Sequence, residues 1–157
     1  ISGGMLAFLE NPSQWQRLSD DPSLIKSTVE EIIRWTTPSI YKRRTATQDV
    51  EFNGTLIQAA DKVTFWEMSA NRDEDIFEQP FEFRIDRSPN RHIGFGAGVH
   101  FCLGAALAQL ELKIVFEELN QVGIQLKLDG DPEWIPNNRL LGLKSLPVKV
   151  VDVGRRG

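Results

Sequence analysis

The sequence predicts a mixed α+β fold in which helices dominate, and three features of the chain lead to that prediction. Two segments, residues 24–35 and 102–120, carry apolar side chains at helical spacing. Several short segments rich in β-branched and aromatic residues are bounded by turn residues, which is the pattern of strands. Between them, residues 74–94 follow neither period. So long an irregular segment in a compact chain is usually functional or disordered.

Helices are expected at the start of the chain. Residues 1–9 and 13–18 predict short helices, the second capped by Ser13. The Asp-Pro-Ser run at residues 21–23 then opens a clear helix over residues 24–35. One face of that helix is apolar and is expected to be buried, through Ile25, Val29, Ile32 and Ile33.

From Tyr41 the pattern becomes one of strands. Residues 44–57 predict a β-hairpin, because the Asn53-Gly54 pair supplies the positive φ angles of a tight turn. Further elements are expected as strands over residues 62–66, 123–128 and 145–151 and as one helical turn over residues 69–73.

The longest predicted helix begins at Cys102 or Leu103 and continues to Asn120. Much of its surface is apolar, so we expect it to be buried on more than one side. The residues concerned are Ala105, Ala106, Ala108, Leu112, Val115, Phe116 and Leu119.

Composition excludes several classes of protein. The 157 residues are the length of one ordinary domain, and a formal net charge of -4 gives no reason to expect a nucleic-acid partner. No apolar run approaches the roughly 20 residues that span a bilayer, and the start of the chain lacks the basic region of a signal peptide. The single cysteine cannot form an internal disulfide. We therefore expect a soluble, cytoplasmic protein without a transmembrane segment.

Cys102 is the residue around which the sequence arranges a candidate site. Gly96 and Gly98 allow backbone conformations and close approaches that a Cβ would forbid. A cysteine at the start of a helix meets free N–H groups and a positive dipole end, which stabilise a thiolate. Gly104 removes bulk where a flat ligand would lie, and Phe95 can shield the sulfur from water.

Four other interpretations of Cys102 compete with that of a metal thiolate. A lone cysteine is most often a buried structural one. A phosphate-binding glycine loop is disfavoured, since Val99 and Phe101 stand where GxGxxG requires glycine. A zinc ion held by Cys102, His92 and His100 lacks an evident fourth ligand. A cysteine nucleophile with His100 as its base is not clearly favoured by a turn at a helix start.

The run from Phe95 to Gly104, Phe-Gly-Ala-Gly-Val-His-Phe-Cys-Leu-Gly, matches position by position the haem-binding signature of the cytochrome P450 family. The chain resembles soluble bacterial members over the C-terminal portion of that fold, with its J, K and L helices, small β-sheet, meander and cysteine loop. The resemblance identifies residues 1–157 as the C-terminal haem-thiolate portion. It places the I helix, with the acid–alcohol pair that delivers protons, upstream of Ile1.

The resemblance also implies roles for individual residues. Cys102 would be the axial iron ligand and the catalytic residue. Arg44 and His100 would bind the two haem propionates, and His92 would lie near the same haem edge. The other residues that the resemblance assigns to the cofactor site are Phe95, Gly96, Gly98, Gly104 and Ala108.

Glu31 and Arg34 resemble the family's Glu-x-x-Arg pair. By itself this spacing indicates a surface ion pair worth a few tenths of a kcal/mol, whereas in the family the pair is buried and supports the haem pocket. An arginine of the meander normally completes a triad with it. Glu82 stands at that position here, and Arg84 and Arg87 are both candidates to replace it.

The activity implied by the resemblance is that of a haem b monooxygenase, which inserts one oxygen atom from O2 into a C–H bond of a hydrophobic substrate such as a sterol side chain or a fatty chain. Residues 38–41 and the turn near Leu143 would form part of the substrate wall. A ferredoxin- or flavodoxin-type redox partner would dock near Arg91 and Gln109. The alternative is a non-catalytic or truncated haem-binding fragment that needs the N-terminal portion for activity. A thiol enzyme without haem is a third interpretation.

Overall fold

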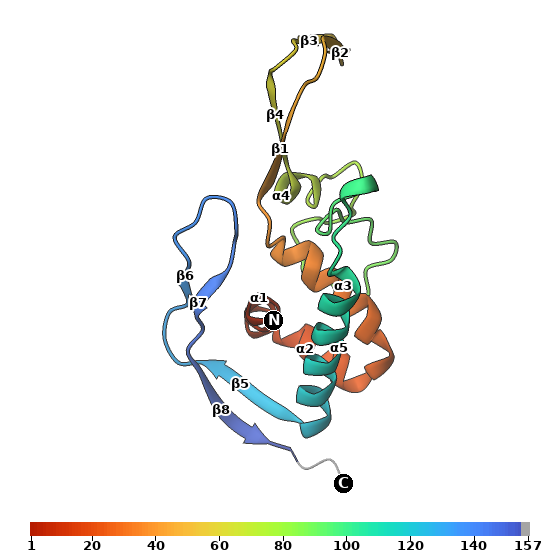
Figure 1. Cartoon of the computed structure of the whole chain (residues 1–157). Helices are drawn as coiled ribbons and strands as arrows, with labels where there is room; N and C mark the ends of the chain where they lie inside the picture. Colours follow the sequence, from red (N-terminus) through yellow and green to blue (C-terminus); the bar gives the residue numbers. More distant parts are fainter. Residues whose placement is uncertain (155–157) are drawn as a thin grey trace.

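The body of the molecule is a group of helices packed around one apolar core, and a computed structural model describes residues 1–154. Figure 1 shows α1, α2, α3 and α5 gathered in this body. At the centre of the core, the Phe8 ring meets Trp15 and Phe83 edge-on at centroid distances of 5.0 and 5.3 Å. The helices are α1 (Ser2–Glu10), α2 (Pro12–Asp20), α3 (Ile25–Thr36), α4 (Glu67–Ala70) and α5 (Ala105–Val122), with short 3-10 turns η1 (Pro22–Leu24) and η2 (Gly98–His100).

Two pairs of strands form an arm that projects from this body (Figure 1). Strand β1 (Tyr41–Thr45) pairs antiparallel with β4 (Lys62–Trp66), and β2 (Val50–Phe52) pairs with β3 (Thr55–Ile57) at the tip. Asn53 and Gly54 have φ angles of 49° and 75°, which confirms the predicted turn. Arg44, however, faces Val63 in the β1–β4 pair rather than belonging to the tip hairpin.

The C-terminal strands form two more antiparallel pairs. Strand β5 (Ile124–Leu128) pairs with β8 (Val148–Val153), and β6 (Glu133–Trp134) pairs with β7 (Leu143–Ser145). The strand predicted over residues 145–151 is divided between β7 and β8, because Pro147 cannot donate a hydrogen bond to a ladder. None of the helices within residues 1–154 is both long and apolar enough to cross a bilayer.

Residues 74–94 contain no helix or strand, as predicted, yet they are part of the core. Phe77, Phe83 and Ile85 from this segment are at most 3% exposed. An irregular segment can be buried only when its backbone polar groups find partners. Side chains of α3 supply some of those partners, since Glu31 accepts the Arg84 N–H and Arg34 donates to the Pro80 and Glu82 carbonyls.

Three predictions about the helices were wrong in detail. Helix α5 begins at Ala105 rather than at Cys102 or Leu103, and Gly104 precedes it as the cap residue. Helix α2 begins at Pro12, whose fixed φ suits a first helical position, so Ser13 is not its cap. Burial of α5 on two sides was also wrong. Its buried residues are Ala105, Leu112, Phe116 and Asn120, whereas Leu107, Leu110 and Ile114 are exposed.

Candidate functional site

Cys102 lies in a tightly closed loop, residues 95–104, which contains η2 and leads into α5. We call this segment the cysteine loop. Its backbone N–H donates to the Phe95 carbonyl at 2.8 Å, and the Gly96 N–H donates to the Ile93 carbonyl at 2.7 Å. Gly96 and Gly98 have φ angles of 73° and 61°, which lie in the left-handed region that favours glycine. The glycines of the motif are therefore required by the backbone that presents the cysteine.

The surroundings of Cys102 are exposed and apolar. Cys102 itself is exposed, so it is not a buried structural thiol. Val99 and Leu103 on either side of it are 98% and 103% exposed. A Cβ built on Gly104 would meet only the Cys102 sulfur, at 4.0 Å. The loop thus presents a thiol beside an open apolar surface, which suits a flat apolar ligand better than an ion.

A zinc site is not formed by these residues. Among the residues that the structure describes, no group of three His, Cys, Asp or Glu side chains lies close enough together to hold a metal ion. His92, one of the three ligands considered, is instead bonded to Glu30.

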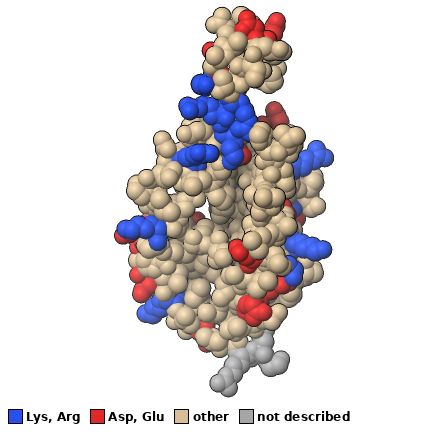
Figure 2. Space-filling model, viewed as in Figure 1, with Lys and Arg blue, Asp and Glu red and all other residues tan. Residues whose placement is uncertain are grey.

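Arg44 and His100 are both exposed side chains. The Arg44 guanidinium stacks over the Phe65 ring at 5.8 Å and donates to the neighbouring Arg43 carbonyl. It has no carboxylate partner among residues 1–154, so it is available to bind one. Lysine and arginine side chains gather where the arm leaves the body (Figure 2), and β1 carries three in succession there, from Lys42 to Arg44. The cysteine loop, at the start of α5, lies at the same end of the body (Figure 1).

His92 has both ring nitrogens bonded within the chain. Its Nε2 lies 2.8 Å from a carboxylate oxygen of Glu30, and its Nδ1 accepts the Gly94 N–H at 3.2 Å. The hydrogen bond from His92 is the largest cause of a lowered pKa at Glu30. Gln109 on α5 donates to the other oxygen of Glu30 at 2.7 Å. His92 therefore has no free nitrogen for a propionate in this structure.

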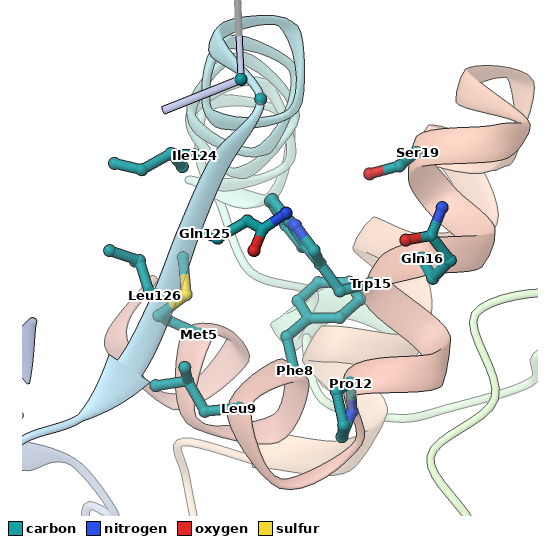
Figure 3. A pocket seen from close by; sticks show the side chains of 12 residues that line it. Met5, Phe8, Leu9, Pro12, Trp15, Gln16, Ser19, Ile124, Gln125 and Leu126 are labelled. Atoms are coloured by element: carbon teal, nitrogen blue, oxygen red, sulfur yellow. The ribbon is translucent and has the colours of Figure 1, made fainter. Parts of the chain in front are cut away.

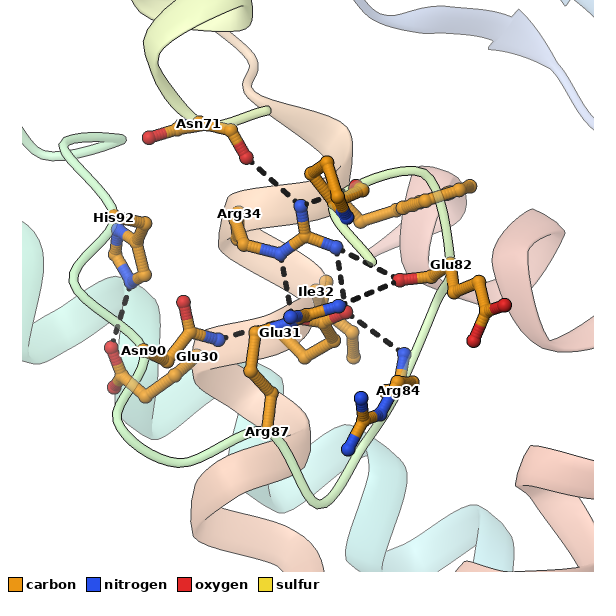
Figure 4. A network of polar contacts seen from close by, with 12 residues as sticks. Glu30, Glu31, Ile32, Arg34, Asn71, Glu82, Arg84, Arg87, Asn90 and His92 are labelled. Atoms are coloured by element: carbon orange, nitrogen blue, oxygen red, sulfur yellow. Dashed lines mark hydrogen bonds and ion pairs between the residues drawn. The ribbon is translucent and has the colours of Figure 1, made fainter. Parts of the chain in front are cut away.

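Glu31 and Arg34 form the centre of a buried network (Figure 4). Both side chains are fully buried, and the Arg34 guanidinium makes two hydrogen bonds of 2.8 Å to the two oxygens of Glu31. The three remaining guanidinium hydrogens are donated to the carbonyls of Asn71, Pro80 and Glu82. All five donors of an arginine are thus used, and the irregular segment is fixed onto α3.

Arg87, rather than Arg84, completes the triad. The Nε of Arg87 donates to Glu31 at 3.1 Å, and its other nitrogens donate to the carbonyls of residues 78, 79 and 82. Burial lowers the pKa of Arg87, and the negative charge of Glu31 opposes that change. Arg84 contributes its backbone N–H to Glu31, while its side chain bonds Gln79 at the surface. Glu82 contributes only its carbonyl oxygen.

Asn71 connects the network to the cysteine loop and was not singled out from the sequence. Its carbonyl accepts from Arg34, its amide nitrogen donates to the Thr37 hydroxyl at 3.0 Å, and its amide oxygen accepts the Ile93 N–H at 2.8 Å. Asn71 is fully buried. The only sequence signal was its place in the Ser-Ala-Asn-Arg-Asp run of residues 69–73. Glu30 and Gln109 were likewise given no such role.

A cavity of about 370 Å³ between α1, α2 and β5 is separate from this site (Figure 3). It is lined by apolar and uncharged polar side chains, including Met5, Phe8, Trp15 and Leu126. It adjoins Gly123 at the C-terminal end of α5, whereas Cys102 precedes the N-terminal end. A helix of 18 residues is about 27 Å long, so the cavity is far from the thiol.

Comparison with known proteins identifies the family. The family model described as Cytochrome P450 matches residues 11–150. The putative cytochrome P450 126 of Mycobacterium tuberculosis is 49% identical over 150 residues, which cover 96% of this chain and 36% of that protein. The methyl-branched lipid omega-hydroxylase of the same organism is 45% identical, with 94% of this chain and 35% of that protein covered. The chain thus spans about a third of the length of these relatives.

Comparison with solved structures identifies the same family. A cytochrome P450-153 from Novosphingobium aromaticivorans superimposes with a TM-score of 0.92 at 41% identity, over 95% of this chain and 38% of that one. Phe95 to Gly104, the cysteine loop, thus stands in a fold shared with solved cytochromes P450. The chain belongs to the cytochrome P450 family.

Proposed function

We propose that the protein containing this chain is a haem-thiolate monooxygenase, which inserts one oxygen atom from O2 into a C–H bond of a hydrophobic substrate, with Cys102 as the axial iron ligand. The single observation that carries the proposal is the exposed Cys102 thiol on a glycine-shaped loop beside open apolar surface. Members of the family bind haem b.

The residues present fit a haem. A thiolate is a suitable axial ligand for haem iron. The missing Cβ of Gly104 leaves space next to the sulfur, where the only neighbouring atom is that sulfur itself. Exposed apolar side chains at Val99, Phe101 and Leu103 would be covered when a porphyrin lies against the loop.

Polar groups would orient the cofactor through its carboxylates. Arg44, with no carboxylate partner among the described residues, can grip a propionate with two parallel N–H groups. His100, exposed within η2, would bind the other propionate. Haem held in this way would supply the chemistry by which O2 oxidises a C–H bond. The roles of the chain would be to hold the thiolate and orient the propionates.

We further propose an aliphatic chain, such as a fatty chain or a sterol side chain, as the substrate. Relatives include the methyl-branched lipid omega-hydroxylase and a steroid C26-monooxygenase of Mycobacterium tuberculosis, the latter 42% identical over 94% of this chain. Support within the chain comes from residues 38–41, which bond to the turn before β7. The Leu141 N–H donates to the Pro38 carbonyl at 2.8 Å, and the Ile40 N–H to the Arg139 carbonyl at 2.9 Å. Leu140, which lies between these two hydrogen bonds, is 54% exposed and would offer an apolar contact to the aliphatic substrate.

Electrons would come from a ferredoxin-type redox partner. We place its docking surface near Arg91 and Gln109, beside the helix that follows the cysteine loop. Arg91 is exposed, and an exposed cation suits an acidic partner.

The test is the spectrum of the reduced protein with carbon monoxide. The haem-loaded full-length protein is expected to give the strongly red-shifted Soret band of a thiolate-ligated haem, and Cys102→Ala is expected to lose it. An ordinary, histidine-type spectrum in the unaltered protein would contradict the proposal, as would an unchanged spectrum in Cys102→Ala.

The alternative is that residues 1–157 bind haem without turnover, since the family's proton-delivering pair is expected upstream of Ile1. A shifted Soret band in residues 1–157, without product when O2, reductant and a fatty substrate are supplied, would favour this alternative for the isolated chain. Product formation by residues 1–157 would exclude it.

A further inference from the structure

We propose that His92 is a positioning residue for the Cys102 ligand, acting through the backbone of residues 92–95. The inference rests on the proposed function, because it concerns the thiolate that would bind haem. His92 does not touch that ligand. Its effect would come from the contacts that fix the neighbouring loop.

The first step is the state of the imidazole. The His92 side chain is 5% exposed, and its Nδ1 accepts the Gly94 N–H at 3.2 Å. A ring nitrogen that accepts a hydrogen bond carries no proton, so the neutral imidazole carries its proton on Nε2. That proton is donated to Glu30, whose oxygen lies 2.8 Å away. The two neighbours therefore select one tautomer of His92.

The second step is that Glu30 is itself held from the other helix. Its second oxygen accepts from the Gln109 side chain at 2.7 Å, and Gln109 belongs to α5 while Glu30 belongs to α3. Figure 4 shows His92 on its loop pointing toward Glu30 on α3. The imidazole is thus fixed to α3 directly and to α5 through Glu30, in the way that outer contacts fix a metal ligand.

The third step leads from His92 to the cysteine. Gly94, which donates to the imidazole, packs closely on α3, since a Cβ there would lie 2.8 Å from the Ile33 Cγ2. The next residue, Phe95, contacts the His92 ring edge-on at 6.1 Å, and its carbonyl accepts the Cys102 N–H at 2.8 Å. His92 therefore fixes the segment that holds the Cys102 backbone.

Three substitutions separate these contacts in the haem-loaded full-length protein. His92→Phe keeps the ring and loses both hydrogen bonds. His92→Asn can place an acceptor near Nδ1, and His92→Gln can place a donor near Nε2 instead. The measurements are the Soret band of the reduced carbon monoxide complex and the haem reduction potential.

We expect His92→Phe and His92→Gln to raise the ratio of unshifted to shifted Soret band on the order of tenfold, because the partly buried Gly94 N–H loses its acceptor. His92→Asn loses Glu30 but keeps an acceptor for the Gly94 N–H, so it is expected to retain more of the shifted band than His92→Gln and a reduction potential closer to that of the unaltered protein. If His92→Phe fails to incorporate haem, the comparison of His92→Asn with His92→Gln still tests whether the acceptor for the Gly94 N–H positions the ligand.

The inference is overturned if the unaltered protein and all three variants show the same shifted band and potential. It is also overturned if His92→Asn behaves like His92→Gln. An unshifted band in the unaltered protein would instead contradict the proposed function, and this inference with it. The two failures are therefore distinguishable.

Discussion

Glu31 lies at the centre of the buried polar network that joins α3 to the irregular segment (Figure 4). Its spacing to Arg34 is that of a surface pair, but the carboxylate is fully buried and accepts from three side chains and one backbone N–H. A charge removed from water is tolerated only when its lone pairs are satisfied. Arg87 and Asn90 provide that satisfaction from more than fifty residues away, which no local pattern could indicate.

Arg34→Met is expected to reduce the free energy of unfolding by about 3–5 kcal/mol, because it leaves the buried Glu31 charge without its main partner. Urea unfolding measures the change. Arg17→Met is the matched control, since the Arg17–Asp86 pair is partly exposed and should contribute at most about 1 kcal/mol. Equal losses in the two variants would contradict the assigned role of Arg34.

The Arg17–Asp86 pair also predicts a dependence on pH. The hydrogen bond from Arg17 lowers the pKa of Asp86 below its ordinary value of 3.8. A carboxyl whose pKa is depressed by folding stabilises the protein above the unfolded pKa, and loses that contribution as pH falls through the folded pKa. The difference in unfolding free energy between the unaltered protein and Asp86→Asn should therefore be fully present at neutral pH and be lost progressively as pH falls below about 3.8 toward the lower pKa of the folded state. A difference that grows on acidification would contradict this expectation.

At the scale of elements, the cysteine loop and α5 act as separate parts. The loop is shaped by its own backbone bonds and by two glycines in left-handed conformations. Helix α5 begins only at Ala105, after the Gly104 cap, so Cys102 lies outside the helix. The loop conformation, rather than a helical position, thus sets the direction of the thiol.

Gly98→Ala and Gly104→Ala distinguish two roles of the loop glycines. Gly98 permits a left-handed backbone, whereas Gly104 leaves room for the haem beside the Cys102 sulfur. Gly98 has a φ of 61° with open space around it, so alanine should cost about 1–2 kcal/mol of stability through strain alone. Gly104 has a φ of -87°, which alanine tolerates, but a methyl there would adjoin the Cys102 sulfur. We expect Gly104→Ala to weaken haem binding while leaving the stability of the haem-free protein nearly unchanged. Haem titration and thermal unfolding of both variants measure the two effects, and unaltered haem affinity in Gly104→Ala would count against the proposed cofactor position.

At the scale of the whole molecule, the chain exposes more surface than a compact protein of its size. Its accessible surface is 10231 Å² at 17.8 kDa, whereas a compact monomer of that mass exposes about 8,000 Å². Large apolar side chains are among the exposed residues. Leu107, Leu110 and Ile114 form a second, uncovered face of α5, and Val150 and Val151 are exposed on β8.

Residues 1–157 expressed alone are therefore expected to self-associate, because exposed apolar faces of this extent favour association. Size-exclusion chromatography with light scattering measures the mass, and dye binding reports exposed apolar surface. Replacing the exposed Leu110 and Ile114 with glutamate should reduce the association, while Leu112→Glu, at a buried position of the same helix, should unfold the protein. A monomer that unfolds sharply and reversibly without haem would contradict the expectation.

Local patterns in the sequence were enough to predict several elements and to indicate the family. Hydrophobic period located α3, and runs of β-branched and aromatic residues located β4 and β5, whereas β6 was not predicted. The Asn53-Gly54 turn was correct in its conformation, and the signature from Phe95 to Gly104 indicated the family that the comparisons confirm. These features depend on neighbouring residues, so a linear pattern contains them.

Which distant groups meet became known only from the packing of the segments. That packing assigned the third position of the triad to Arg87, bonded His92 to Glu30, and connected Asn71 to the cysteine loop. It also left the outer face of α5 uncovered, where an apolar pattern had predicted burial. Burial and long-range hydrogen bonds arise from packing between segments, and the spacing of residues within one segment does not specify its partner.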